Sequence, residues 1–354
     1  MATHRAAILP TKGALFTIQA RPTPPPSPGE LLIAVKSIAL NPADIIMRNT
    51  GLFIPSYPTV TGFDMAGLVL EVGEDVPSAF KPGTRVAAYS ASAWKGCNPD
   101  YGAFQEICLV PWQHAAILPQ GISWHHAATL PVAVQVPLSA WDAMGIPRTG
   151  KDTASGIEKR EALLIWGASS SVGTMGVQTA RILRVDPSSF IAAVYAVAGA
   201  ENLNYVRSLG ADRVFDYKDP CVVDAIISAA RQDGLVIKHC FLATGDLASC
   251  QAVLRGFIAK TKTAKIASAP PVPSDAEVIE GLETIFVMPS NAEEERLEQF
   301  RSWMTWLSEN IEKGTIRPSP EPKVVGKGLE AINEGLDELA LGVSCTKLVV
   351  EVSW

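Results

Sequence analysis

The chain has 354 residues, of which 47% are hydrophobic and 19% are charged, and its formal net charge is −6. These values are typical of a soluble globular protein with room for two hydrophobic cores, and they argue against a disordered chain. The acidic balance disfavours nucleic acid as a partner. No apolar run is long enough to cross a bilayer, and the first residues lack the apolar segment of a secretory signal, so we expect a cytoplasmic protein.

Short apolar runs separated by glycine and proline fill the first third of the chain. They predict strands over 31–35, 67–72, 83–89 and 104–110. Many short strands with such turn residues are typical of a β-barrel or a β-sandwich.

After about residue 125, apolar strands alternate with helical patterns, and this alternation predicts a parallel, doubly wound sheet. The predicted strands are 162–166, 191–197, 213–215, 238–243, 265–269 and 284–288, and the predicted helices are 172–183, 202–209 and 222–230. The polar segment 148–160 is expected to be an exposed loop that leads into this sheet. Apolar residues at helical spacing from Leu297 to Ile311 predict one more helix, packed on a core.

The six cysteines and five histidines are scattered, and no CxxC or HExxH pattern occurs among them. We interpret the cysteines as reduced, buried thiols. Metal binding is disfavoured because no set of ligands has suitable spacing.

The segment Trp166-Gly-Ala-Ser-Ser-Ser-Val-Gly173 follows a predicted strand and begins a predicted helix. Backbone N–H groups and the dipole at a helix N-terminus bind the pyrophosphate of a nucleotide. In this segment Gly167 permits a tight turn, Gly173 permits close packing of helix on strand, and three serines, Ser169, Ser170 and Ser171, add hydroxyl donors. The middle glycine of a GxGxxG is missing, so an ordinary turn with a serine N-cap is the alternative. The surrounding alternation of strands and helices favours nucleotide binding.

The end of the second strand in this series should distinguish NAD from NADP. An acidic residue there binds the ribose diol, whereas basic or hydroxyl residues accommodate a 2′-phosphate. The segment is Val197-Ala-Gly-Ala-Glu201-Asn202, and Glu201 carries its one charge. Downstream, Tyr217 offers a ring and a hydroxyl to the adenosine end. These signals conflict, and they leave both NADPH and NADH open.

Several motifs fall in the order known from medium-chain dehydrogenases and reductases. They are Asn41-Pro-Ala-Asp44, Gly62-Phe-Asp-Met-Ala-Gly67, Pro82-Gly-Thr-Arg-Val86, Gly102-Ala-Phe-Gln-Glu106 and Ala127-Ala-Thr-Leu-Pro131, with 328–337 and 344–350 near the C-terminus. Across nearly its whole length the chain resembles the zinc-independent quinone and enoyl reductases of this superfamily, and most of all the fungal trans-acting enoyl reductases that partner polyketide synthases.

The resemblance implies an α/β protein with a GroES-like β-barrel catalytic domain and a doubly wound Rossmann domain. The expected boundaries are 1–130 for the first part of the catalytic domain, 131–289 for the Rossmann domain and 290–354 for the C-terminal return. Zinc-dependent relatives place a cysteine, a histidine and a glutamate where this chain has Asn41, Phe63 and Asp64. Phenylalanine cannot bind a metal and an amide is a poor zinc ligand, so no zinc is expected. The structural zinc lobe needs four closely spaced cysteines, and only Cys97 lies in that region.

The resemblance also implies a set of cofactor-binding residues. They are Asn41, Pro42, Ala43 and Asp44 beside the nicotinamide, Ser169, Ser170, Ser171 and Val172 at the pyrophosphate, Gly199, Ala200, Glu201, Asn202 and Tyr217 at the adenosine, Ser268 and Ala269 near the nicotinamide, and Val343 and Ser344 over the cofactor. The inner wall of the substrate pocket is expected from Val132, Ala133, Val134, Gln135, Val136, Pro137, Leu138 and Ser139, which would equally suit a core strand or helix. Asn41, Asp44 and Tyr101 are candidate catalytic residues, with a structural or cofactor-positioning role as the alternative.

Three departures from the family pattern affect positions expected to contact the cofactor. Gly199 and Glu201 replace the serine and lysine that hold a 2′-phosphate, Val136-Pro137 replaces Thr-Ala, and His239 replaces an acidic residue. Reversing a charge beside a phosphate costs on the order of a few kcal/mol.

The resemblance predicts an NADPH-dependent reductase that transfers hydride to the C=C bond of an α,β-unsaturated thioester or ketone in polyketide biosynthesis, with NADH as a possible donor. The expected partners are an apolar or carrier-protein-bound substrate and a polyketide synthase, with neither nucleic acid nor membrane. The protein is expected to be a monomer or a homodimer, since the last strand, 284–288, could pair across a dimer. The alternative is a non-redox isomerase, cyclase or binding protein that kept the fold and lost the nucleotide site.

Overall fold

The computed structural model describes residues 2–148 and 159–353 and divides into two compact units. The split unit consists of Met1–Val132 and Ser290–Trp354, and the inserted unit is Ala133–Pro289. The sequence placed the first junction two residues earlier, after residue 130, since the expected ranges are 1–130, 131–289 and 290–354. Most of the predicted loop 148–160 falls on 149–158, outside the described residues.

The inserted unit contains a six-stranded parallel sheet in the order β10-β9-β8-β11-β12-β13. This order, with the reversal between β8 and β11, is that of a dinucleotide-binding fold, and it confirms the predicted doubly wound sheet. The strands are β8 Glu161–Trp166, β9 Ile191–Ala198, β10 Arg213–Asp216, β11 His239–Leu242, β12 Ala264–Ser268 and β13 Leu282–Phe286.

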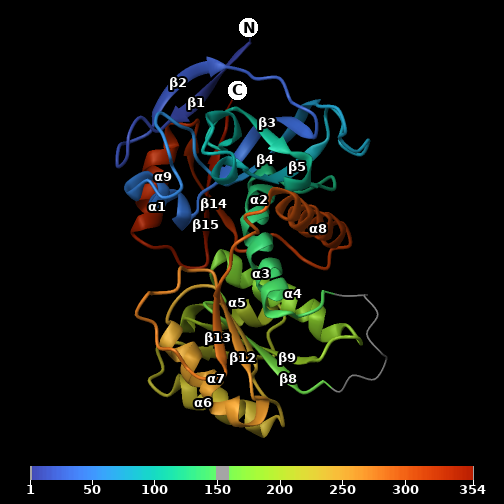
Figure 1. Ribbon diagram of the computed structural model, residues 1–354, viewed down its shortest axis with the longest axis vertical. Coiled ribbons are helices and arrows are strands. Elements are labelled where there is room, and N and C mark those ends of the chain that lie inside the picture. Colours follow the sequence, from blue (N-terminus) through green and yellow to red (C-terminus); the bar gives the residue numbers. More distant parts are fainter. Residues whose placement is uncertain (1, 149–158, 354) are drawn as a thin grey trace. The chain divides into compact units, whose positions relative to one another are not determined.

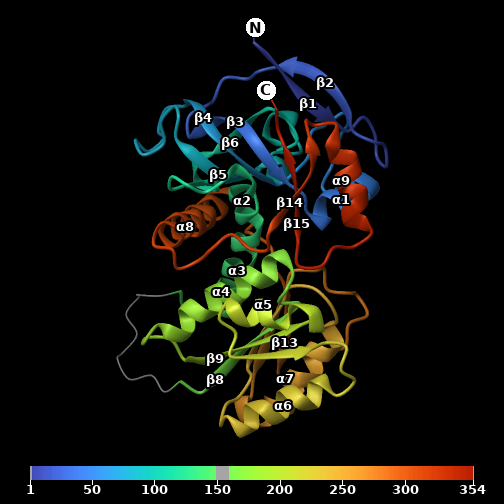
Figure 2. The same ribbon diagram turned by 180° about the vertical axis from the view of Figure 1, so that it is seen from behind.

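Helices cover both faces of this parallel sheet. The helices α6 and α7 lie together on the face that carries Leu164 and Trp166 (Figure 1). On the other face, α4 packs closely because Gly176 has no side chain: an added Cβ would lie 2.9 Å from the ring of Phe241. Figure 2 shows α4 and α5 from behind. The helices are α4 Ser171–Val185, α5 Leu203–Ser208, α6 Val222–Gln232 and α7 Leu247–Thr261, and the sequence reading missed α7.

The split unit contains a seven-stranded sheet in the order β14-β15-β3-β4-β5-β7, and β6 pairs with β3. The long strand β3 (Glu30–Ala39) pairs with β4, β6 and β15, so it connects the N-terminal strands to the C-terminal return. The other strands of this sheet are β4 Asp64–Val72, β5 Arg85–Tyr89, β6 Ile107–Pro111, β7 Ala115–Ile117, β14 Pro322–Lys327 and β15 Lys347–Glu351. The strands β1 Thr3–Ile8 and β2 Thr17–Pro22 form a separate two-stranded sheet.

Helices of the split unit lie around this mixed sheet, in which only β14 and β15 of the described strands pair in parallel. They are α1 Pro42–Thr50, α2 Trp124–Ala128, α8 Glu293–Glu312 and α9 Ala331–Ala340. The predicted apolar stripe of α8 is confirmed, because Phe300, Met304 and Leu307 are all buried. The N-terminal strands and β15 belong to the same unit, so both ends of the chain lie in it (Figure 1).

The residues predicted to line a substrate pocket form the first half of the helix α3, Leu130–Met144, which contains Pro137. Val134 and Leu138 are fully buried, so they belong to the core. Val132 and Val136 are partly exposed and are one helical turn apart, on one face. Only these two apolar side chains of the segment are therefore placed to meet a ligand. Within 2–148 and 159–353, no helix is long and apolar enough to span a membrane.

Candidate functional site

The loop after β8 has the tight geometry that its two glycines predict. Gly167 adopts a positive φ of 76°, and an added Cβ there would lie 2.5 Å from the carbonyl oxygen of Thr244. At Gly173, an added Cβ would lie 2.2 Å from the carbonyl oxygen of Gly167. Real Cβ atoms do not come this close to a backbone oxygen, so both positions require glycine.

Serine side chains organise the N-terminus of α4. Ser170 is the N-cap, and its hydroxyl accepts a hydrogen bond from the backbone N–H of Gly173 over 3.1 Å. The hydroxyl of Ser171 is buried and has no hydrogen-bond partner in the described part of the chain. A buried hydroxyl without a partner is costly, and it lies beside the first-turn N–H groups, which have no partner within the helix. The loop therefore fits a phosphate.

Backbone hydrogen bonds bring the other predicted nucleotide segments to the same edge of the sheet. The N–H of Ala168 donates to Val197 over 2.8 Å, and the N–H of Tyr217 donates to Ala198 over 3.2 Å. The segment Gly199–Asn202 follows Ala198 directly, as the 3-10 turn η4 (Ala200–Asn202). On the other side of β8, the N–H of Ala269 donates to Leu242. The predicted residues of the inserted unit thus lie together along the carboxyl ends of its strands, where open parallel sheets bind ligands.

His239 does not belong to this edge, and its assignment as a departure at a cofactor-contacting position is wrong. It begins β11, and its Nδ1 lies 2.6 Å from Oε1 of Glu161, which begins β8. In a parallel sheet the amino ends of all strands lie along one side and their carboxyl ends along the opposite side. His239 and Glu161 therefore form a buried pair at the amino ends of the strands, opposite to the phosphate loop.

A buried polar cluster lies in the split unit, where β3 ends and β15 begins. The side-chain amide of Asn41 donates to Oδ2 of Asp64 over 3.0 Å, and the ammonium group of Lys347 donates to Oδ1 of Asn41 over 2.6 Å. Lys347 Nζ also lies 3.2 Å from Asp64 Oδ2, and the N–H of Val132 donates to Asp64 Oδ1 over 2.8 Å. All the atoms of Asp64 that can accept a hydrogen bond are thus used within the protein.

Asp44 completes this cluster at the start of α1. Its Oδ2 accepts a hydrogen bond from the N–H of Asn41 over 2.8 Å, which is the usual contact of an acid in the first turn of a helix. Its Oδ1 is buried without a partner among the described residues. Burial raises the pKa of Asp44 to about 8, against the opposing effect of the Asn41 N–H. Burial also raises the pKa of Asp64, while Lys347 acts to lower it.

Asn41, Phe63 and Asp64 stand where zinc-dependent relatives are expected to bind their metal, and they do not fit a zinc ion. The amide of Asn41 is held by Asp64 and Lys347, and the phenyl ring of Phe63 packs 5.7 Å from that of Tyr89 and has no donor atom. The Lys347 ammonium already supplies the positive charge that faces Asp64. In the described ranges there is no group of three or more His, Cys, Asp or Glu side chains that could hold a metal. We therefore assign no metal chemistry to this cluster.

Tyr101 is separated from the other two candidate catalytic residues. Its hydroxyl donates to Oε1 of Glu30 over 2.6 Å, at the beginning of β3, whereas Asn41 follows the end of that strand. Val343 and Ser344 are exposed in the segment between α9 and β15, shortly before Lys347. The sequence analysis named Asn41, Asp44 and Asp64 but gave Lys347 no role. The one signal for Lys347 is its position directly before the apolar run Leu348-Val-Val350.

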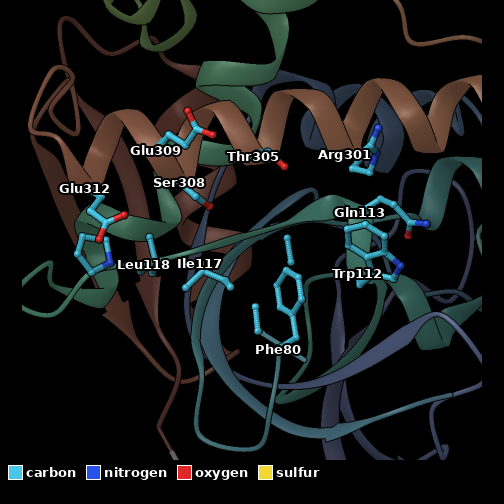
Figure 3. A pocket seen from close by; sticks show the side chains of 13 residues that line it. Phe80, Trp112, Gln113, Ile117, Leu118, Arg301, Thr305, Ser308, Glu309 and Glu312 are labelled. Carbon is cyan, nitrogen blue, oxygen red and sulfur yellow. The ribbon is translucent and has the colours of Figure 1, made fainter. Parts of the chain in front are cut away.

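A pocket of about 400 Å³ lies between α8 and the β-rich part of the split unit. Figure 3 shows Phe80 and Trp112 below the helix, which presents Thr305 and Ser308 toward them. Arg301, Glu309 and Glu312 form a charged rim. None of the predicted cofactor or substrate residues lines this pocket.

Comparisons with known proteins agree with the fold. The family described as alcohol dehydrogenase GroES-like domain matches residues 27–120. The trans-enoyl reductase tndF of Aspergillus flavipes is 38% identical over an alignment of 354 positions that covers 98% of each chain. The trans-enoyl reductase tazE of Aspergillus terreus is 38% identical over 297 residues, 82% of this chain and 93% of that protein. An alcohol dehydrogenase superfamily protein from Novosphingobium aromaticivorans has the same fold, with a TM-score of 0.77, 20% identity and coverage of 99% and 100%.

Proposed function

Because the chain belongs to the medium-chain dehydrogenase/reductase superfamily, in the group of the fungal trans-enoyl reductases, we propose that it reduces the C=C bond of an α,β-unsaturated thioester or ketone. The hydride donor is a nicotinamide nucleotide. The observation that carries this proposal is the phosphate loop at the N-terminus of α4. It combines two obligatory glycines with the Ser171 hydroxyl, which has no hydrogen-bond partner among the described residues. The non-redox alternative is not favoured, because this loop is intact and the relatives are named as reductases.

The proposed cofactor site lies along the carboxyl ends of the strands of the inserted unit. The loop from Gly167 to Gly173 binds the pyrophosphate, and Tyr217 lies at the adenosine end. Ser268 and Ala269, at the end of β12, approach the nicotinamide. The family resemblance also assigns residues 41–44, Val343 and Ser344 of the split unit to the cofactor, and that assignment stays a prediction from the sequence. A bound nicotinamide nucleotide supplies the hydride that is transferred to the substrate. The choice between NADPH and NADH depends on the segment that follows β9.

The residues of the buried cluster act by positioning. Asn41 and Asp44 are buried and take part in hydrogen bonds within the split unit, and Tyr101 donates to Glu30, so we assign the three residues a positioning role rather than that of a proton donor. The cluster holds the start of α1 and the start of β15 in fixed places through Lys347. A fixed backbone at these two points orients residues 41–44 and the segment before β15 without further reorganisation during the reaction.

We propose Val132 and Val136 as the part of α3 that contacts the substrate, because they are the partly exposed apolar side chains of that segment. An apolar acyl chain suits this face. The names of the fungal relatives support the reaction class, an enoyl reduction. We further propose that the substrate is carried by a polyketide synthase, which would be the protein's partner, and that the protein is cytoplasmic. Either a monomer or a homodimer is compatible with β13, which is at one edge of the parallel sheet.

The proposal is tested with the purified chain in two steps. The first is titration of NADH and NADPH, followed by nicotinamide fluorescence and by calorimetry. The second is turnover of a short α,β-unsaturated thioester with the nucleotide that binds, followed at the nicotinamide absorbance and by mass spectrometry of the product. We expect micromolar binding of one nucleotide and a product two mass units heavier than the substrate. If neither nucleotide bound, the proposal would be refuted.

A further inference from the structure

The pocket between α8 and the β-rich part of the split unit has no part in the proposed reaction. Its volume is about 400 Å³, which is within the range of small-molecule sites in proteins. None of the residues expected to bind the nucleotide or the substrate lines it, and all of its lining residues belong to the split unit. A ligand of this pocket would therefore be a second one, bound by the split unit itself.

The wall of the pocket opposite α8 is apolar and mainly aromatic. The rings of Phe80 and Trp112 lie side by side, with their centres 6.1 Å apart and their planes tilted by 49°. Ile117 and Leu118 extend this wall. Aromatic side chains pack well against other flat rings, because stacked and edge-to-face contacts are both favourable. This wall suits a flat apolar group.

The other wall is one polar face of α8, formed by positions 301, 305, 308, 309 and 312. In the middle of this face are two short side chains, Thr305 and Ser308, which point toward the aromatic rings (Figure 3). Longer side chains at these two positions would fill the space between the helix and the rings. The pocket is therefore open where a ring could lie between the aromatic wall and the helix, with two hydroxyl groups beside it.

Negative charge gathers at one end of this face. Glu309 and Glu312 lie in the last turn of α8, which contains no basic residue, and the partial negative charge at a helix C-terminus adds to theirs. Lys313, just after the helix, lies 3.3 Å from Glu309, but this pair is exposed and weak. Within residues 2–148 and 159–353, Glu312 forms no ion pair. This end of the pocket attracts a cation.

The opposite end of the face carries a compensated charge. The guanidinium group of Arg301 donates two hydrogen bonds to the carboxylate of Glu298, over 2.7 Å and 2.5 Å. Because Glu298 balances its charge, Arg301 has little attraction left for an anionic ligand. The charge of the pocket is therefore set by its acidic end.

We propose that this pocket binds a small aromatic amine in its protonated form. The ring of the amine packs on Phe80 and Trp112, and its ammonium group is attracted by Glu312 and Glu309. The site goes beyond the proposed function, since it shares no residue with the cofactor or substrate positions.

The test compares three probes that share an indole ring and differ in charge. Tryptamine is a cation at pH 7, tryptophol has a hydroxyl in place of the ammonium group, and indole-3-acetate is an anion. Each is titrated into the full chain by calorimetry. We expect tryptamine to bind with a Kd of about 1 mM or below. Tryptophol and indole-3-acetate should bind about fivefold or more weakly, because they lack the positive charge.

Three variants assign the binding to this pocket. Glu312→Gln should weaken the binding of tryptamine about fivefold and leave that of tryptophol within about twofold. Thr305→Phe, at an exposed position, fills the middle of the pocket and should abolish the binding of both probes. Glu294→Gln is the matched control, since it makes the same change at an exposed position at the beginning of α8, outside the pocket, and should leave the affinity for tryptamine within about twofold.

Thermal unfolding of each variant shows that the fold is retained. The inference would be overturned if tryptamine did not bind, if tryptophol bound as tightly as tryptamine, or if either Glu312→Gln or Thr305→Phe kept the affinity of the wild type for tryptamine. Each of these results would leave the proposed function standing, because that function is tested by the binding of NADH and NADPH.

Discussion

The ammonium group of Lys347 lies 2.6 Å from Oδ1 of Asn41, a residue 306 positions earlier in the chain. The same group lies 3.2 Å from Oδ2 of Asp64, and the side chains of Lys347 and Asp64 are only 5% and 0% exposed. A buried carboxylate is stable only with such a partner. This contact therefore fastens the C-terminal return to the N-terminal part of the split unit, at the place where zinc-dependent relatives hold their metal.

Replacing Lys347 by methionine should destabilise the protein strongly. The substitution keeps the length of the side chain and removes its charge, so Asp64 is left buried without a cation. We expect the free energy of unfolding to fall by about 3–5 kcal/mol, as for other buried pairs that lose one partner. Chemical denaturation at pH 7 measures this change.

Two further variants separate the buried charge from the loss of a lysine as such. Lys323→Met removes a lysine whose ion pair with Glu338 is exposed, and it should cost about 1 kcal/mol or less. The double variant Lys347→Met/Asp64→Asn should recover part of the loss, because the carboxylate is then gone. Equal losses for Lys347→Met and Lys323→Met would contradict the role given to the buried contact.

The sequence predicted the inserted unit better than the split unit, for a physical reason. The strand–loop–helix of the phosphate site is local, and Gly167, Gly173 and Ser170 act within a few residues of one another, so their spacing identifies them. The contact of Lys347 with Asn41 depends on the pairing of β15 with β3, which local spacing does not reveal. Likewise, His239 could be placed at an edge of the sheet only after the start of β11 was known.

The pKa of Asp44, raised to about 8 by burial, predicts a dependence of stability on pH. Between about pH 4 and pH 8 the folded protein keeps the Asp44 proton, while the unfolded chain has released it. The folded state therefore binds more protons, and its stability decreases as the pH rises through this window. Asp44→Asn removes this contribution.

From pH 5 to pH 8, the unfolding free energy of the wild type should fall by roughly 2–4 kcal/mol relative to that of Asp44→Asn. Denaturant titrations of both proteins at several pH values measure it, and taking the difference cancels the other titrating groups. Asp275→Asn, at an exposed loop position, serves as the control and should show no such trend. A difference for Asp44→Asn that is independent of pH would refute the prediction.

Ser171→Ala should separate nucleotide binding from stability. The hydroxyl is buried and has no partner within residues 2–148 and 159–353, so its removal should leave the unfolding free energy unchanged or raise it by up to about 1 kcal/mol. If the hydroxyl donates to the pyrophosphate, the affinity for the preferred nucleotide should fall about tenfold, the usual effect of losing a hydrogen bond to a charged group. Ser170→Ala is the matched control: it removes the N-cap and should destabilise the protein by about 1 kcal/mol. If Ser171→Ala kept the nucleotide affinity of the wild type, the Ser171 hydroxyl would not be a ligand of the phosphate.

The pair of His239 and Glu161 should matter for stability and not for the nucleotide. Both side chains are buried, and the 2.6 Å contact lies at the edge opposite to the phosphate loop. His239→Leu leaves the Glu161 carboxyl buried without this partner, so we expect a loss of about 2–4 kcal/mol in unfolding free energy. The double variant His239→Leu/Glu161→Leu should lose less, because it leaves no polar group of the pair unpartnered. Nucleotide affinity should stay within about twofold of wild type in both variants, since the charges changed lie far from the ligand edge. If His239→Leu lost nucleotide affinity but kept its stability, His239 would have to be assigned to the cofactor site.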